Sequence, residues 1–189
     1  CTLMDEFINF IKQYIFLTEE AEAEIRNLAI QKEYKKGDFL IEEGKTCNHL
    51  HFLVEGVSRT YFYQKGKDIT HWIYPPNNII TSWHSYLLRK PSSEYIELTE
   101  SAILVSLSYD NWQELYQKYP KLERFGRLII EEQIALIDDF YKGYYFLSAK
   151  EKYDLLISNF PSITQIANLG HIASMLGISQ ETLSRIRGK

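Results

Sequence analysis

The sequence predicts an α+β protein: an antiparallel β-barrel or jelly roll, then a long helix and a small helical domain. Three observations support this fold class. Short stretches rich in β-branched and aromatic residues are separated by glycines at Gly37, Gly44, Gly56 and Gly66. Residues 121–145 carry a long apolar pattern with helical spacing. Residues 169–189 have the spacing of two short helices joined by a tight turn.

Two helices are expected before the barrel. Apolar residues recur with helical spacing from Phe7 to Tyr14, and Thr18 is a candidate N-cap for a second helix that ends near Leu28. Strands are then expected at residues 39–41, 49–54, 58–63, 69–74, 95–98 and 102–107, with a hairpin turn at residues 65–67. Several short strands at this spacing favour a barrel or jelly roll.

Two further helices should follow the barrel. A short one is expected at residues 111–117, and Pro120 separates it from the long helix at about residues 121–145. One side of the long helix carries apolar residues at three-, four- and seven-residue spacings, and its other sides are apolar as well. We expect one side to pack on the barrel and another on a second copy of the chain, although the helix could simply cover the barrel. The candidate dimer residues are Leu122, Phe125, Ile129, Leu136 and Phe140.

The chain divides into three predicted parts. Ser148 and Glu151 have the spacing of a capping box, so a new helix should start there, after a hinge at residues 143–147. The predicted parts are residues 1–120 for the N-terminal helices and barrel, 121–146 for the dimerisation helix and hinge, and 147–189 for the helical domain.

The last predicted part has the pattern of a DNA-binding helix-turn-helix. Apolar residues from Ile172 to Ile186 fall where two crossing helices must bury side chains, Gly177 sits at the turn, and Ser179 can cap the second helix. The polar side chains of that helix have no core to fill and suit phosphates and base edges. A helical hairpin that only packs against the domain is the alternative. The candidate DNA-binding residues are Ser179, Gln180, Glu181, Thr182, Ser184, Arg185 and Arg187.

Composition narrows the possible settings. The chain has 189 residues, 45% of them hydrophobic, and a net charge of −4, yet the segment after Pro161 is mildly basic. We expect a cytoplasmic protein without a membrane partner, because no apolar run is long enough to span a bilayer and no signal peptide is evident. Two cysteines, Cys1 and Cys47, fit a reducing compartment. Because the chain begins with Cys1, the sequence leaves its true start open.

In this order of elements the chain resembles the Crp/Fnr family of bacterial transcription regulators. The matching segments are YKKGDFLIEEG (34–44), HLHFLVEGVSRTYFY (49–63), LSAKEKYDLLI (147–157) and IASMLGISQETLSRI (172–186). The resemblance implies a cyclic-nucleotide-binding-like barrel, a homodimer joined by the long helix, and binding to palindromic double-stranded DNA operators. It places Gln180, Glu181 and Arg185 at base-reading positions. RNA polymerase and a small-molecule effector are further candidate partners.

The segment that would bind a cyclic nucleotide departs from the family pattern. Thr81-Ser82 stands where the nucleotide-binding members carry Gly-Glu, and Ser92-Ser93 where they carry Arg and a small neighbour. Arg89 is near but displaced. Without a cation, burial of a phosphate would be costly, so we predict that the protein does not bind cyclic AMP. We expect no cofactor, since two cysteines cannot supply the four ligands of an iron–sulfur cluster.

An effector pocket in the barrel is a further hypothesis, and core packing of the same residues is its alternative. The candidate lining residues are Tyr61, Tyr63, Trp72, Thr81, Ser82, Trp83, Ser92 and Ser93.

Two other functional classes stay open. His49, His51 and Glu55 resemble part of the first cupin metal motif, which would indicate a metal-binding barrel enzyme, but the second motif is not visible. A ligand-sensing barrel that acts only through protein contacts is the third possibility. We expect neither catalytic residues nor a metal site.

Overall fold

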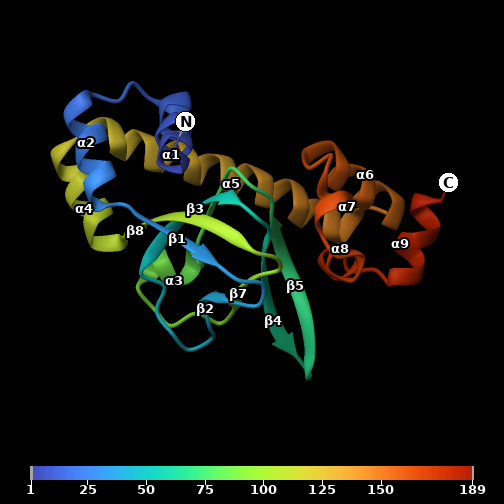
Figure 1. Cartoon of the computed structure of the whole chain (residues 1–189). Coiled ribbons are helices and arrows are strands. Elements are labelled where there is room, and N and C mark those ends of the chain that lie inside the picture. The colour runs from blue at the N-terminus through green and yellow to red at the C-terminus, as the bar shows by residue number, and fades with distance from the viewer. Residues whose placement is uncertain (1, 189) are drawn as a thin grey trace.

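The computed structural model describes residues 2–188, so the sequence-based expectations for Cys1 and Lys189 lie outside the described residues. A β-barrel lies at one end, helix α5 crosses over it, and a helical domain lies at the far end of α5 (Figure 1). The helices are α1 (Leu3–Tyr14), α2 (Glu19–Leu28), α3 (Trp83–Leu88), α4 (Tyr109–Lys118), α5 (Pro120–Phe146), α6 (Ala149–Asn159), α7 (Ile163–Ile166), α8 (Leu169–Leu176) and α9 (Gln180–Arg187).

Two four-stranded antiparallel sheets make the barrel, in the orders β1-β8-β3-β6 and β2-β7-β4-β5. The predicted fold class is therefore confirmed. The strands are β1 (Ile30–Tyr34), β2 (Phe39–Ile41), β3 (His49–Glu55), β4 (Ser58–Gln64), β5 (Lys67–Tyr74), β6 (Asn78–Ile80), β7 (Tyr95–Leu98) and β8 (Ala102–Ser108).

The sequence-based prediction missed two strands and two short helices. Strand β1 is an almost fully exposed edge strand with the sequence IQKEY, so no buried alternation marks it. Strand β6 has only three residues, too few to show an alternating pattern. Helices α3 and α7 have six and four residues, too few to show a helical period.

The inside of the barrel is filled by aliphatic side chains from both sheets. Leu53, Ile80 and Ile96 are fully buried there. Cys47 and Tyr74 join the same cluster. This packing leaves the barrel interior as a core, as is usual for small barrels.

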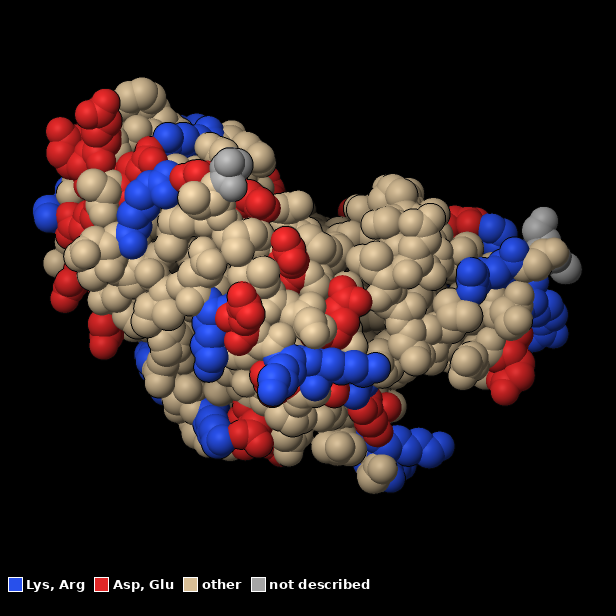
Figure 2. Space-filling view, viewed as in Figure 1, with Lys and Arg blue, Asp and Glu red and all other residues tan. Residues whose placement is uncertain are grey.

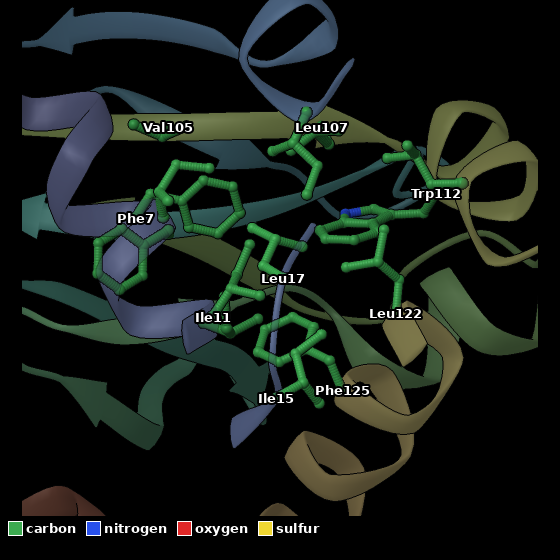
Figure 3. Packing of buried hydrophobic residues seen from close by; sticks show 14 of the residues in the cluster. Phe7, Ile11, Ile15, Leu17, Val105, Leu107, Trp112, Leu122 and Phe125 are labelled. Atoms are coloured by element: carbon green, nitrogen blue, oxygen red, sulfur yellow. The ribbon is translucent and has the colours of Figure 1, made fainter. Parts of the chain in front are cut away.

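A second core lies between the barrel and the N-terminal helices and includes the first half of α5 (Figure 3). Phe125 of α5 is 2% exposed and stacks on Trp112 at 6.1 Å between ring centroids. Leu122 and Ile129 are buried in the same cluster. These three predicted dimer residues therefore pack within their own chain, because α1 and α4 cover the helix here, and the prediction assigned them to the wrong contact.

A third core joins the helical domain to the barrel. Leu156, Ile172 and Leu183 are fully buried in one cluster with Val57 and Ile73 of the barrel. Phe140, another predicted dimer residue, packs here with its ring centroid 4.9 Å from that of Trp72. The helical domain therefore rests on the β4–β5 hairpin.

The predicted hinge at residues 143–147 is mostly helical. Helix α5 continues to Phe146, and only Leu147 and Ser148 precede α6, whose capping box with Glu151 is confirmed. Gly143 is buried, and a Cβ there would lie 3.0 Å from Leu155 Cδ2. This glycine thus permits close packing of α5 on α6. Within residues 2–188, none of the helices combines the length and apolarity needed to cross a bilayer.

Candidate nucleic-acid interface and effector cassette

Helices α8 and α9 form the predicted helix-turn-helix. Asn168 caps α8, accepting a hydrogen bond from the Gly170 N–H at 2.7 Å. Gly177 ends α8 in the left-handed region at φ 65°, and the Ile178 N–H donates to the Ala173 carbonyl at 3.0 Å. These bonds close the helix with a Schellman-type turn, which requires a residue that tolerates positive φ.

The Ser179 hydroxyl caps α9 by accepting from the Thr182 N–H at 3.2 Å. Leu183 is fully buried and anchors the helix against α6 and α8, while Ile186 is half-buried. The candidate DNA-binding side chains lie on the remaining face. Gln180, Glu181, Ser184, Arg185 and Arg187 are exposed, and Thr182 is half-buried.

Hydrogen bonds at the start of α9 order two of these polar groups. Hydrogen bonding to its own backbone N–H, then to the Ser179 hydroxyl, lowers the pKa of Glu181, so this carboxylate is ionised at neutral pH. Arg185 Nη2 donates to the Thr182 hydroxyl at 3.3 Å. The start of the helix thus combines an acceptor with a positioned guanidinium, the two side-chain types that read cytosine and guanine edges.

Charge is distributed unevenly over the molecule. Figure 2 shows acidic side chains gathered over α1 and α2 and basic ones at the free end of the helical domain. In the described residues after Pro161 the charged side chains are Glu181, Arg185 and Arg187, so this segment is mildly basic although the whole chain carries −4. A local basic surface is what an anionic polymer would meet at this end.

Thr81, Ser82 and Ser92, which belong to the segment that would bind a cyclic nucleotide (hereafter the cassette), are buried, and Ser82 lies against the carboxylate of Glu94. Ser82 Oγ donates to Glu94 Oε1 at 2.7 Å and lies 3.1 Å from Ser92 Oγ. Thr81 Oγ1 donates instead to the His49 carbonyl at 3.0 Å. The Glu94 side chain is 18% exposed. Sequence reasoning missed Glu94, whose largely buried carboxylate occupies the cassette and whose Oε2 lies 3.4 Å from His71 Nδ1.

Arg89 does not compensate for this negative charge. Its guanidinium donates to the carbonyls of Cys47 and Tyr86 at 2.9 and 3.2 Å. It also lies over the Tyr109 ring, 4.0 Å from the centroid. Arg89 therefore stabilises the end of α3, where it occupies a left-handed position at φ 54°, and is committed to backbone partners.

The predicted effector-pocket residues do not line one cavity. Tyr61 stacks on Tyr95 at 5.1 Å, and Tyr63 beside it is exposed. Trp72 faces Phe140 outside the barrel, and Trp83 packs against the N-terminal core. Ser93 is exposed. Tyr61 and Tyr63 lie on one face of β4, with ring centroids 5.7 Å apart, but the barrel interior is already filled by other side chains.

The histidines of the cupin-like pattern have structural partners. His51 is buried, and its Nδ1 shares a 2.7 Å hydrogen bond with the Ser106 hydroxyl. Burial, then the neighbouring His49, lowers the pKa of His51 to about 3. Glu55 is exposed at the far end of the strand. Residues 2–188 contain no group of three or more side chains placed to hold a metal ion.

A polar contact between the barrel and α8 was also missed by sequence reasoning. Arg59 is buried and binds Asp68 and Glu97, with N–O distances of 2.6 and 3.0 Å. Next to this group, the Thr70 N–H donates to Ser174 Oγ at 2.9 Å. Burial, then the charge of Arg59, lowers the pKa of His171 on α8. The pairing of Arg59 with an acid nine residues later is too common a pattern to reveal this contact from sequence.

Comparisons with known proteins agree with this architecture. Residues 31–119 match the cyclic nucleotide-binding domain family. A search of curated protein sequences finds no match. Among solved structures, FixK2 from Bradyrhizobium japonicum is similar at 14% identity, covering 85% of this chain and 83% of that one, with a TM-score of 0.72.

Two other regulators have the same arrangement. A transcriptional regulator assigned to the Crp/Fnr family from Eubacterium rectale is 18% identical, covering 90% of this chain and 82% of its own, with a TM-score of 0.69. The c-di-GMP responsive global regulator CLP from Xanthomonas campestris is 12% identical, covering 90% of each chain, with a TM-score of 0.66. Residues 31–119 thus match the cyclic nucleotide-binding domain family, and the chain as a whole shares its fold with these solved structures.

Proposed function

We propose that this protein is a homodimeric, sequence-specific DNA-binding transcription regulator of the bacterial cytoplasm and not an enzyme. The main support for this proposal is the exposed polar face of α9. This face lies opposite the buried Leu183 and presents Gln180, Glu181 and Arg185. In a dimer, two such helices enter successive major grooves of a palindromic operator about 34 Å apart. RNA polymerase is the candidate partner at the promoter.

The second half of α5 supports the dimer. Apolar side chains at positions 134, 137, 141 and 144 follow the alternating three- and four-residue spacing of a coiled-coil seam. Ile134, Ile137, Tyr141 and Tyr144 are 61, 50, 62 and 54% exposed in the single chain. A parallel pairing of two α5 helices would bury this strip, hereafter the α5 seam, and would place both α9 helices at one end of the dimer.

The DNA-binding proposal is tested with purified protein and a random pool of duplexes. Selection should enrich a palindromic sequence. Arg185→Ala should weaken binding to that operator by about 1–3 kcal/mol and relax the preference at one base position. Lys36→Ala, which removes an exposed cation on the barrel, is the matched control and should bind as the parent does. Equal affinity of the parent chain for the selected operator and for random DNA would refute the proposal.

We further propose that cyclic nucleotides are not the effector of this regulator. The support is the Glu94 carboxylate at Ser82, together with the commitment of Arg89 to carbonyl groups. Burial of a phosphate beside a carboxylate, without a lysine or arginine to pair with it, is disfavoured. Calorimetry with cyclic AMP and cyclic GMP should detect no binding at micromolar concentrations, and operator affinity should not change. Micromolar binding of either nucleotide would contradict this proposal.

A further inference from the structure

A cavity lies where the barrel, α5 and the helical domain meet, and its lining includes His71, whose Nδ1 is 3.4 Å from Glu94 Oε2. Its volume is about 200 Å³, and it is lined by β5, α5, α6 and α8. Figure 1 shows why these elements converge: α5 runs past β5 directly to α6, with α8 packed below. The cavity walls therefore belong to both the barrel side and the DNA-binding side of the molecule.

The walls are aromatic and aliphatic. Trp72 meets Phe140 edge-on, with centroids 4.9 Å apart and an interplanar angle of 78°. Leu155 and Met175 add apolar side chains, and Ile137, Tyr141 and Tyr144 of the α5 seam also line the cavity. A dry engineered cavity of about 150 Å³ binds benzene. The space at the domain junction thus suits one aromatic ring with a short substituent.

A lysine side chain, that of Lys152, is part of this mostly apolar lining. Lys152 Nζ lies 4.7 Å from the centroid of the Tyr144 ring and 3.5 Å from the Leu176 carbonyl oxygen. Within residues 2–188, no carboxylate oxygen lies within 4.0 Å of this ammonium group, whereas Lys150 on the same helix is paired with Asp154. An ammonium group beside an apolar cavity is complementary to a ligand with one anionic end.

We propose that this cavity binds a small aromatic carboxylate. Its ring packs against the side chains of Trp72, Phe140 and Leu155, and its carboxylate accepts a charge-assisted hydrogen bond from Lys152. The aromatic and charged halves of the ligand thus meet different domains, since Trp72 is on the barrel and Lys152 is on α6.

The ligand has a regulatory consequence, which rests on the proposed function. Tyr144, whose ring lies beside Lys152, also contacts the turn between α8 and α9, where a Cβ on Gly177 would be 2.7 Å from Tyr144 Cε2. Occupancy of the cavity stabilises this docked arrangement over any other. A ligand that binds one arrangement better must change operator affinity if the operator selects between them.

The test measures binding to the full chain without DNA. Calorimetry with benzoate, phenylacetate and 4-hydroxybenzoate should show at least one acid binding once per chain with micromolar Kd. Benzamide, a neutral analogue of benzoate, should bind at least tenfold more weakly. Ligand should also quench tryptophan fluorescence, and Trp72→Phe should abolish that change.

Two variants and a matched control decide the outcome. Lys152→Met should weaken acid binding at least tenfold and leave benzamide unaffected, whereas Lys150→Met, on the same helix, should behave as the parent. Leu155→Trp fills the cavity and should abolish binding of all compounds, with circular dichroism and thermal unfolding reporting its fold.

Failure of this inference is distinct from failure of the proposed function. The inference is overturned if none of the three acids binds, for example because a second copy of the chain fills the cavity. It is also overturned if an acid binds equally well to the parent and to a folded Lys152→Met chain. A chain that binds an acid but no specific DNA overturns the proposed function alone.

Discussion

Both halves of α5 carry apolar side chains with helical spacing, but their surroundings are opposite. In the first half Phe125 and Leu122 are at most 2% exposed, because α1 and α4 cover them. In the second half Ile134 and Tyr141 are more than 60% exposed. A helical pattern thus predicts which side chains need cover but not whether the cover comes from the same chain. The first half stabilises the fold, and we infer that the second half joins two copies.

Phe125→Ala tests the first half of α5 and should cause the largest loss in the free energy of unfolding. The ring contacts Phe10, Tyr14 and Trp112, with centroid distances of 5.6–6.1 Å. Removal of a fully buried phenyl group costs about 3–5 kcal/mol. Urea unfolding should show this loss, and the association state at native conditions should not change. A loss below about 1 kcal/mol would mean that this half is not the main support of the N-terminal core.

Ile134→Glu tests the second half of α5. It should change the association state of the protein and leave the stability of the single chain nearly unchanged. An exposed substitution changes the free energy of unfolding of one chain by only about 0.5 kcal/mol. In the proposed dimer, however, two carboxylates would face each other across the α5 seam, at a cost of several kcal/mol. Analytical ultracentrifugation should show folded monomer.

Arg127→Glu is the control for this substitution, because Arg127 is exposed on the first half of α5 and pairs with Glu131 of its own helix. This variant should remain dimeric. A dimeric Ile134→Glu protein would place the contact between copies elsewhere.

Sequence reasoning identified most elements but misjudged several surfaces. Ser179, Gly177 and the capping box at Ser148 were predictable because caps and turns are local and depend on a few adjacent residues. The role of Glu94 was not predictable, because its contact with Ser82 depends on how α3 and β7 meet in space. The same holds for Phe140, which the helical pattern placed on a dimer face but which packs on Trp72.

Acid should lower the free energy of unfolding of the chain through the buried His51. The folded-state pKa of this buried histidine is about 3, below its ordinary 6.5, so the unfolded chain binds its proton first as pH falls. Stability from neutral His51 is complete above pH 6.5 and declines by about 1.4 kcal/mol per pH unit below it, until the pH reaches the folded pKa. Unfolding measured at pH 7 and pH 5 should show this slope, and it should be shallower in His51→Gln. Parallel slopes in the two proteins would assign the acid sensitivity to other groups.

Gly177→Ala should cause a smaller loss of stability than Phe125→Ala. It tests how the second half of α5 contacts the helix-turn-helix. Alanine at φ 65° costs about 1–2 kcal/mol from backbone strain alone, and its Cβ would press on Tyr144 at 2.7 Å. Gly37→Ala is the matched control, because Gly37 also has positive φ, at 89°, but no atom lies within 4 Å of its added Cβ. Subtracting the loss for Gly37→Ala from that for Gly177→Ala, both by thermal unfolding, isolates the contact with Tyr144. A difference above zero, removed in the Tyr144→Ala background, would show that the turn between α8 and α9 packs tightly on the Tyr144 ring. Equal losses in the two variants would show instead that the Tyr144 ring moves aside without a measurable cost and does not hold the turn.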